Sequence, residues 1–316
     1  MIAPCRSLVL LLTAVVVSGQ QHYVFLNRDR ARIADAAFLE HPKLTGAQIK
    51  YVWPELEPEK DRYDFSTIQK DSDFLRQKGK ALFIQVQDVS FSEEIVNVPR
   101  YLREAGGVVR QYEEEGKKRV PNGWVARRWD PAVRERFHLL LSALGAKFDG
   151  QIAGINLAET AIGVKEGEAG FTNSGYRDAV IANMAALKQA FPKSVTMQYA
   201  NFMPGEWLPW ENKGYLQRVY EAARRLKVGL GGPDLLPHRK GQLSHAYPRI
   251  AESHGVVPTG VAVQEGNYQH QHPKTGRRLT VSELHGFARD TVKVDYIFWS
   301  TQEPFYTRDV LPYLRR

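Results

Sequence analysis

Short apolar runs alternate with longer stretches of helical period along the chain, from about residue 22 onward. The apolar runs predict eight buried strands, at residues 22–27, 47–53, 81–87, 152–158, 195–201, 228–231, 260–264 and 296–299. The stretches between them include predicted helices at residues 65–77, 132–146, 176–190, 215–226, 246–254 and 281–290. This alternation is typical of repeated strand-helix units around a parallel sheet.

The number of these units decides the expected fold. Eight strands with interleaved helices predict an α/β fold, a single (β/α)8 TIM barrel, for which about 250 residues is typical. We therefore expect one barrel domain over residues 20–316. An open doubly wound sheet is the alternative, but no Gly-x-Gly-x-x-Gly follows the first strand to favour it.

The first 19 residues read as a secretory signal peptide. Arg6 precedes an apolar run at residues 8–17, and small residues follow it, so we expect cleavage near Gly19. A buried N-terminal helix is the alternative. The run is about half of the roughly 20 apolar residues that a spanning helix needs, so we expect no membrane span. Export, to the periplasm or the medium, is the predicted localisation.

Composition narrows the chemistry that the chain can perform. Cys5 is the single cysteine and lies in the expected signal peptide, which removes thiol nucleophiles, disulfides and thiolate metal sites from the mature protein. Lysine and arginine number 43 against 35 acidic residues, a formal net charge of +8. This charge fits an acidic partner such as an anionic polysaccharide, and equally plain solubility. No basic run with interleaved aromatic residues indicates nucleic acid.

One connection is much longer than the others, from residue 88 to residue 130. Long connections after barrel strands lie on the face where barrel enzymes place their active sites. This one carries rings and guanidinium groups that could wall a sugar-binding cleft: Tyr101, Tyr112, Trp124, Trp129, Arg127 and Arg128. We expect the two arginines to bind the substrate, through uronate or sulfate groups if it is anionic.

Function in a barrel collects at the carboxyl ends of the strands, so the polar residue that closes each run is a candidate. Two glutamates stand out because each follows a strand of alternating apolar residues. Glu159 follows Ile155 and Leu157, and Glu265 follows Val261 and Val263. If those apolar side chains fill the barrel, period-2 alternation points both carboxylates to its mouth and into one cleft.

Two carboxyl groups across one cleft are what glycoside hydrolysis needs. One donates a proton to the leaving oxygen while the other attacks the anomeric carbon or activates water. A separation of about 5–5.5 Å indicates retention of configuration, and about 6.5–9.5 Å indicates inversion.

Several segments between about residues 44 and 300 resemble the clan A glycoside hydrolases. After the second strand, residues 51–65 read YVWPELEPEKDRYDF, similar to the W-x-x-L-E-P-x-x-G-x-Y-D-F stretch of that superfamily. Residues 98–102, VPRYL, resemble its P-x-W/Y-L, and Trp129-Asp130-Pro131 before a helix is also similar. Phe298-Trp299 resembles the strand-eight tryptophan that floors the sugar subsite.

The resemblance implies roles for both glutamates. In that superfamily the acid/base glutamate ends strand four and the nucleophile ends strand seven, the places of Glu159 and Glu265. It therefore implies a retaining hydrolase of a β-linked glycan, with Trp53 and Trp299 as sugar platforms.

One departure concerns the residue before the acid/base. Clan A enzymes carry an asparagine there, which contacts the sugar 2-hydroxyl, and this chain has Ala158. Asn156 or Asn201 could supply the contact, or it is absent. Tyr199 could resemble the tyrosine that tunes the nucleophile. This departure favours the alternative function, a non-catalytic glycan-binding barrel of the cell envelope.

The sequence therefore predicts an exported glycoside hydrolase whose partner is an oligo- or polysaccharide. Glu159 and Glu265 are its expected catalytic residues. The expected substrate-binding residues are Trp53, Gln87, Asn156, Tyr199, Asn201, Asp234, Gln264, Trp299, Arg127 and Arg128. We expect no cofactor. His270 and His272 have the look of a metal pair, but no carboxylate stands at matched spacing, so we expect no metal.

Overall fold

The computed structural model describes residues 19–27, 29–116, 118–207 and 209–316. Apart from Gly19, the expected signal peptide at residues 1–19 lies outside the described residues. Within the described part of the chain, no helix is both long and apolar enough to cross a bilayer.

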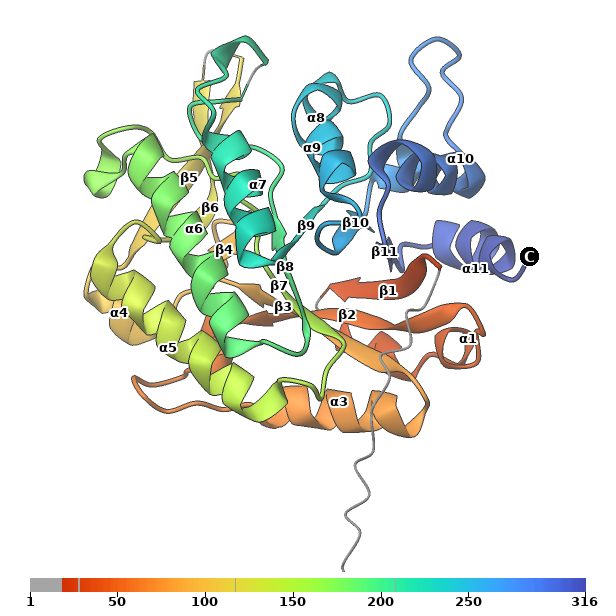
Figure 1. The fold of residues 1–316 in the computed structure, drawn as a ribbon, viewed down its shortest axis with the longest axis horizontal. Coiled ribbons are helices and arrows are strands. Elements are labelled where there is room, and N and C mark those ends of the chain that lie inside the picture. Colours follow the sequence, from red (N-terminus) through yellow and green to blue (C-terminus); the bar gives the residue numbers. More distant parts are fainter. Residues whose placement is uncertain (1–18, 28, 117, 208) are drawn as a thin grey trace, which may run out of the picture.

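Parallel strands close into a barrel with the order β1-β11-β10-β9-β8-β7-β3-β2. Figure 1 labels these strands at the centre of the molecule. The strands are β1 (Gln21–Asn27), β2 (Leu44–Val52), β3 (Ala81–Gln87), β7 (Gly154–Leu157), β8 (Val195–Tyr199), β9 (Gly229–Gly232), β10 (Thr259–Val263) and β11 (Tyr296–Ser300). Each of the eight apolar runs overlaps one of them, so the predicted TIM barrel is confirmed.

Helices surround the barrel (Figure 1). The longer ones are α3 (Ser66–Gln77), α5 (Pro131–Phe148), α6 (Asn173–Ala190), α7 (Tyr215–Leu226) and α9 (Ala246–Ser253), and all were predicted from the sequence. The shorter ones are α1 (Ala36–Leu39), α2 (Trp53–Leu56), α4 (Arg100–Glu104), α8 (Lys240–Ser244), α10 (Val281–Gly286) and α11 (Leu311–Leu314). The predicted helix at residues 281–290 is α10 and a π-helical continuation, Phe287–Val292.

Local signals fix where these helices begin. The carboxylate of Asp130 accepts a hydrogen bond from the N–H of Ala132 at 2.9 Å, and Pro131 occupies the first turn of α5. Thr280 and Glu283 form a reciprocal capping box at the start of α10. Both arrangements satisfy backbone donors that the first helical turn leaves without partners.

The barrel strands separate two hydrophobic cores. Inside the barrel lie Tyr23, Phe25, Phe83, Met197, Tyr199, Ala262 and Phe298. Glycines make room for these side chains, because a Cβ on Gly154 would stand 2.5 Å from the ring of Phe83 and one on Gly260 would stand 2.8 Å from Met197. The larger core lies between the strands and the helices.

This division corrects the expected faces of β7 and β10. Ile155, Leu157, Val261 and Val263 belong to the core between strands and helices, not to the barrel interior. Parallel strands are buried on both faces, so an alternating apolar set does not reveal which face points inward. The interior set is displaced by one residue, to positions such as Ala262.

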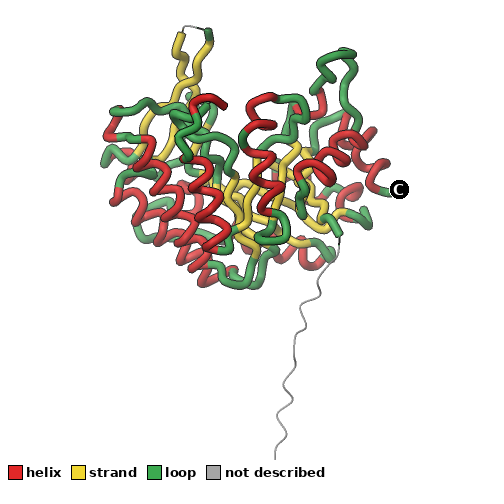
Figure 2. The backbone as a smooth tube through the Cα atoms, turned by 45° about the horizontal axis from the view of Figure 1, so that its top comes forward, coloured by secondary structure: helices red, strands yellow, loops and turns green. Residues whose placement is uncertain are grey.

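The long connection after β3 forms a separate antiparallel sheet in the order β4-β6-β5. Its strands are β4 (Val89–Ser90), β5 (Val108–Glu115) and β6 (Lys118–Ala126), and the β5–β6 hairpin projects beyond the barrel in Figure 2. The hairpin contacts the segment after β7, because the N–H of Tyr112 donates to the Gly163 carbonyl at 2.9 Å. In return, the N–H of Gly163 donates to the Gln111 side chain at 3.2 Å.

Candidate functional site

A cavity of about 280 Å³ opens at the carboxyl ends of the barrel strands. Strands β1, β2, β3, β8 and β10 contribute lining residues, and Glu159 and Pro233 follow β7 and β9. The lining residues are Phe25, Asn27, Lys50, Gln85, Gln87, Val89, Ser90, Phe91, Ser92, Ile95, Asn97, Glu159, Tyr199, Pro233, Ala262 and Gln264. Four of the predicted site residues lie here: Gln87, Glu159, Tyr199 and Gln264.

Glu159 stands two residues beyond β7, where the chain leaves the strand. The Asn201 amide donates to its Oε2 at 2.6 Å. Desolvation by the surrounding protein raises the pKa of Glu159 to about 7, and the negative charge of Asp234 acts in the same direction. The Asn201 hydrogen bond, Lys50 and Arg128 oppose this rise. Glu159 is therefore a carboxyl group that holds its proton near neutral pH and faces a cavity.

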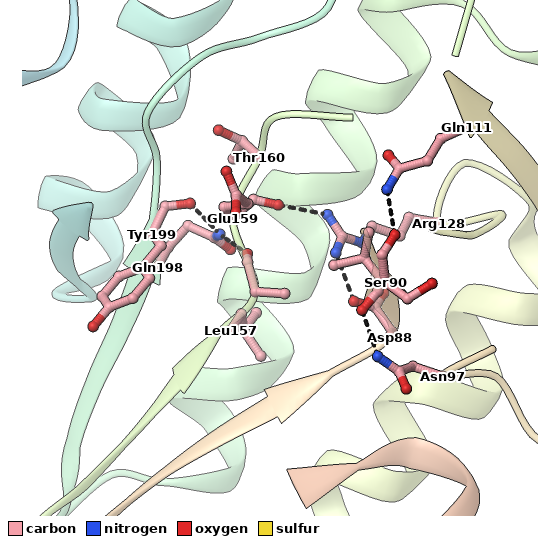
Figure 3. A network of polar contacts seen from close by, with 12 residues as sticks. Asp88, Ser90, Asn97, Gln111, Arg128, Leu157, Glu159, Thr160, Gln198 and Tyr199 are labelled. Carbon is pink, nitrogen blue, oxygen red and sulfur yellow. Dashed lines mark hydrogen bonds and ion pairs between the residues drawn. The ribbon is translucent and has the colours of Figure 1, made fainter. Parts of the chain in front are cut away.

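A buried ion pair fixes the backbone of Glu159. Arg128 donates to both carboxylate oxygens of Asp88, at 2.6 and 2.7 Å, and both side chains are buried. Its remaining Nη1 donates to the Glu159 carbonyl at 3.0 Å and to the Tyr176 hydroxyl at 2.8 Å, as Figure 3 shows in part. The conformation of the chain at Glu159 thus depends on side chains from two other segments.

Amide side chains fill the barrel below the cavity. Gln48 donates to the Asn156 side chain at 2.9 Å and to the Tyr199 hydroxyl at 2.9 Å. Gln198 donates to the Ala158 carbonyl at 2.7 Å. The Asn156 side chain therefore bonds to Gln48 inside the barrel, whereas Asn201 is the asparagine that contacts Glu159.

Glu265 lies outside the cavity of Glu159. It is exposed and lines a neighbouring cavity of about 450 Å³, together with Arg32 and Glu303. The two cavities share Phe25, Asn27 and Gln264. The two glutamates thus line adjoining cavities, because the inward register of β10 presents Ala262 and Gln264 to the cavity of Glu159.

Asp234 is the carboxylate whose charge acts on Glu159. It follows β9, and its Oδ1 accepts a hydrogen bond from the Asn267 amide at 3.1 Å. The backbone N–H of Leu235 in turn donates to Asn267 at 2.8 Å. Asp234 is thus held in place beside the cavity, at the end of the sixth barrel strand.

Trp53 and Trp299 are core residues in this structure, which corrects their assignment as sugar platforms. Both belong to the core between strands and helices and are fully buried. The Trp53 indole donates to Glu57 at 2.9 Å, and the Trp299 indole donates to His22 at 3.1 Å. The register of β11 explains this, because Phe298, not Trp299, points into the barrel.

Trp299→Phe is expected to lower the free energy of unfolding by about 1–2 kcal/mol, because it removes a buried hydrogen bond and part of a buried side chain. Chemical denaturation measures this change. Substrate affinity should stay within twofold of the wild type. A large rise in KM with unchanged stability would contradict this core assignment and indicate that Trp299 contacts the substrate.

Arg127 and Arg128 also lie away from the cavity lining. Arg127 donates to the carbonyls of Gly106 and Ala169, each at 3.0 Å, and pairs with Asp130 at 3.3 Å. Arg128 is buried in its ion pair. The two guanidinium groups that were expected to bind an anionic substrate therefore bind backbone carbonyls and carboxylates of the protein instead.

Comparisons with known proteins relate this barrel to enzymes that act on sugars. The fold is similar to that of the β-amylase catalytic domain from Paenibacillus polymyxa, with a TM-score of 0.56, 9% identity, and coverage of 90% of this chain and 93% of that one. A family 39 glycoside hydrolase from Bacteroides cellulosilyticus WH2 matches with a TM-score of 0.54 and 11% identity, over 89% of this chain. This chain spans 56% of that enzyme.

A xylanase 10B from Thermotoga petrophila RKU-1, solved with xylobiose, matches with a TM-score of 0.50 and 12% identity, over 89% of this chain and 82% of that one. No protein-family model and no curated protein matches the sequence. At these identities the likeness establishes the fold alone: the chain folds as a (β/α)8 barrel, as these enzymes do.

Sequence reasoning missed several residues of the cavity. Lys50 lies inside β2 and not at its end, so the rule that selects the polar residue closing a strand does not reach it. A polar residue two positions after the buried Gln48 was the available signal. Asn27 closes β1 and satisfies that rule, but it was not among the predicted site residues. Phe91, from the long connection, has an exposed fraction of 51% and offers a ring at the cavity.

Proposed function

We propose that the protein is a glycoside hydrolase that cleaves a β-linked glycan, with Glu159 as the general acid. The observation that carries this proposal is the carboxyl group of Glu159, whose pKa of about 7 keeps it protonated in a cavity of a glycoside hydrolase-like barrel. A protonated carboxyl group is what the leaving oxygen of a glycoside requires. Turnover on a panel of β-linked polysaccharides tests the proposal, and hydrolysis of none of them would contradict it.

The second carboxylate is proposed to be Glu265, acting as the nucleophile of a retaining mechanism. A sugar lying across Gln264 would contact both cavities, since that residue lines each of them. Asp234 is the competing candidate, favoured by its charge coupling to Glu159. Glu265→Gln should abolish the first chemical step, whereas Asp234→Asn should retain activity. The opposite pattern assigns the role to Asp234.

The pH dependence of hydrolysis follows from the protonation of Glu159. Activity should fall as the pH rises through about 7, because the general acid then loses its proton. Removing the Asp234 charge lowers the pKa of Glu159, so Asp234→Asn should move this limb to lower pH. The measurement is the pH profile of kcat/KM from about pH 4 to about pH 9, for the wild type and for Asp234→Asn. A limb that stays in place in Asp234→Asn contradicts the assignment of this limb to Glu159.

Export is part of the proposal. Residues 1–19 carry the features of a cleaved signal, and the barrel strands begin at Gln21, directly after the expected cleavage site. The mature protein would then be the catalytic barrel of residues 20–316, in the periplasm or the medium. N-terminal sequencing of the protein recovered from those fractions tests this, and a retained Met1 contradicts it.

A non-catalytic glycan-binding barrel is the second candidate function. Gln264 favours it, because an amide stands where β10 presents a residue to the cavity of Glu159. Glycan binding without hydrolysis by the wild-type protein identifies this function.

A further inference from the structure

Two buried amide side chains line the cavity of Glu159. Gln85 and Gln87 belong to β3 and are only 3% and 8% exposed. Their Oε1 atoms have no hydrogen-bond partner among the described residues. A buried acceptor without a partner is costly, and native proteins leave few of them. Two such acceptors in one cavity point to a ligand that completes their hydrogen bonds.

The two amides stand on one face of β3, two residues apart, so their backbone attachment points are separated by about 6.6 Å along the strand. A primary amide carries an acceptor and donors in one plane, and a half turn about its last bond exchanges them. Within the described part of the chain, no hydrogen bond to either Oε1 opposes that half turn. The pair can therefore offer an acceptor from one glutamine and a donor from the other.

A secondary amide is the ligand group that matches such a pair. It is planar and trans, so its N–H and its C=O point to opposite sides and bond to two partners at once. A carboxylate offers acceptors alone and would leave both Oε1 atoms without a donor. Two hydroxyl groups are the competing ligand chemistry, and the apolar part of the lining decides between them and an amide.

The segment after β3 gives the cavity an apolar wall, formed by Val89, Phe91 and Ile95. Phe91 and Ile95 are exposed, so large apolar side chains meet water at the cavity. A methyl group on the ligand would cover part of this surface, whereas hydroxyl groups would lose water there without gaining a partner. An amide that carries a methyl group therefore fits this lining better than a pair of hydroxyl groups.

We propose that the cavity binds an acetamido sugar, whose amide bonds to Gln85 and Gln87 and whose methyl group contacts Phe91 and Ile95. The inference rests on the proposed function and names its substrate class, a glycan that contains an N-acetylated amino sugar. The acetamido group is uncharged, so its recognition needs no charged side chain. The cavity volume of about 280 Å³ is near the lower limit of about 300 Å³ for ligand pockets, which suits a single sugar unit.

The first test measures binding, so that it does not depend on turnover. N-acetyl-D-glucosamine, D-glucosamine and D-glucose are titrated into the full protein by calorimetry. We expect N-acetylglucosamine to bind at least tenfold more tightly than glucose, because two hydrogen bonds and a buried methyl group contribute about tenfold to a hundredfold in affinity. Glucosamine has the nitrogen without the acetyl group and should bind more weakly than N-acetylglucosamine. Equal binding of N-acetylglucosamine and glucose, or tighter binding of glucosamine, overturns the inference.

Variants then assign the preference to the two glutamines. Gln85→Met and Gln87→Met keep the length of each side chain but remove its amide, and each should lower the ratio of N-acetylglucosamine to glucose affinity at least fivefold. Gln77→Met makes the same change on the exposed surface of α3 and should keep that ratio. A preference that survives both cavity substitutions overturns the inference.

Thermal unfolding of the same variants distinguishes a ligand-binding role from a structural one. An acceptor without a partner does not stabilise the free protein, so neither Gln85→Met nor Gln87→Met should lower Tm in the absence of sugar. N-acetylglucosamine should raise Tm of the wild type more than that of either variant. A lower Tm of both variants without sugar would show that the amides stabilise the fold, and this result overturns the inference.

Hydrolysis separates this inference from the function on which it rests. Matched β-N-acetylglucosaminide and β-glucoside substrates are compared in the wild type. Faster turnover of the glucoside contradicts the substrate class and leaves the hydrolase proposal standing. Binding of N-acetylglucosamine through the two glutamines without hydrolysis of either substrate supports the acetamido site and contradicts the hydrolase proposal.

Discussion

Glu159→Gln is expected to reduce glycoside hydrolysis by about 100-fold or more, because a positioned general acid contributes about 10²–10⁴-fold. Glutamine keeps the shape of the side chain and can still accept the hydrogen bond from Asn201. The loss should be smaller on a substrate whose activated leaving group needs no protonation. Initial rates on the two kinds of substrate measure the difference. Glu252→Gln, on the exposed surface of α9, is the matched control and should retain full activity.

Stability provides an independent readout of the same variant. The pKa of Glu159 is about 7 in the folded protein, against 4.5 for an ordinary glutamate, so the folded state retains a proton that the unfolded state releases first. Wild-type stability should therefore fall as the pH rises from about 4.5 through 7. Glu159→Gln has no such dependence, and above pH 7 it should be more stable than the wild type by up to about 3 kcal/mol. A variant that is less stable at every pH contradicts this view of Glu159.

Breaking the buried ion pair of Asp88 and Arg128 is expected to have the largest effect on the fold. Asp88→Ala leaves a buried guanidinium group without its carboxylate, which costs about 3–5 kcal/mol. Without Asp88 the Arg128 side chain is no longer held in position, and Arg128 donates to the Glu159 carbonyl at 3.0 Å. Asp88→Ala should therefore also lower turnover. Chemical denaturation measures the first effect, and initial rates measure the second.

Two controls make this prediction specific. Glu104→Ala breaks an ion pair with Arg100 whose side chains are exposed, and it should change stability by less than about 1 kcal/mol. Replacing both buried partners, in Asp88→Leu with Arg128→Met, should recover much of the lost stability but not the turnover. Equal stability of Asp88→Ala and Glu104→Ala would show that the pair has no structural role.

The order of the strands and helices could be predicted from the sequence because each barrel strand is a short apolar run with a helical stretch after it. The sequence did not reveal which face of each strand points into the barrel. Val261 and Val263 are as apolar as an interior pair would be, yet they pack against helices, while Ala262 and Gln264 face inward. A displacement of one residue therefore changed the expected neighbour of Glu159.

The same limit applies to the site residues. Glu159, Gln87 and Tyr199 were found because each is a polar residue at or just beyond the end of a barrel strand, where side chains can reach the cavity. Glu265 also follows a strand but lines the neighbouring cavity, because the register of β10 turns Gln264 toward Glu159.

Trp299 was misassigned because its environment depends on whether it or Phe298 points inward. Lys50 was missed because only contacts across the closed barrel show that a residue inside a strand reaches the cavity.

The β5–β6 hairpin cannot be treated as an interchangeable loop. Its residues Gln111 and Tyr112 exchange hydrogen bonds with Gly163, four residues beyond Glu159, and Gln111 also donates to the Ser90 carbonyl at 2.6 Å. A Cβ on Gly163 would stand 1.7 Å from the Tyr112 carbonyl oxygen, so only glycine permits this approach. A new hairpin grafted here to change specificity would have to be transferred together with the Gly163 segment, because the two segments are hydrogen-bonded to each other.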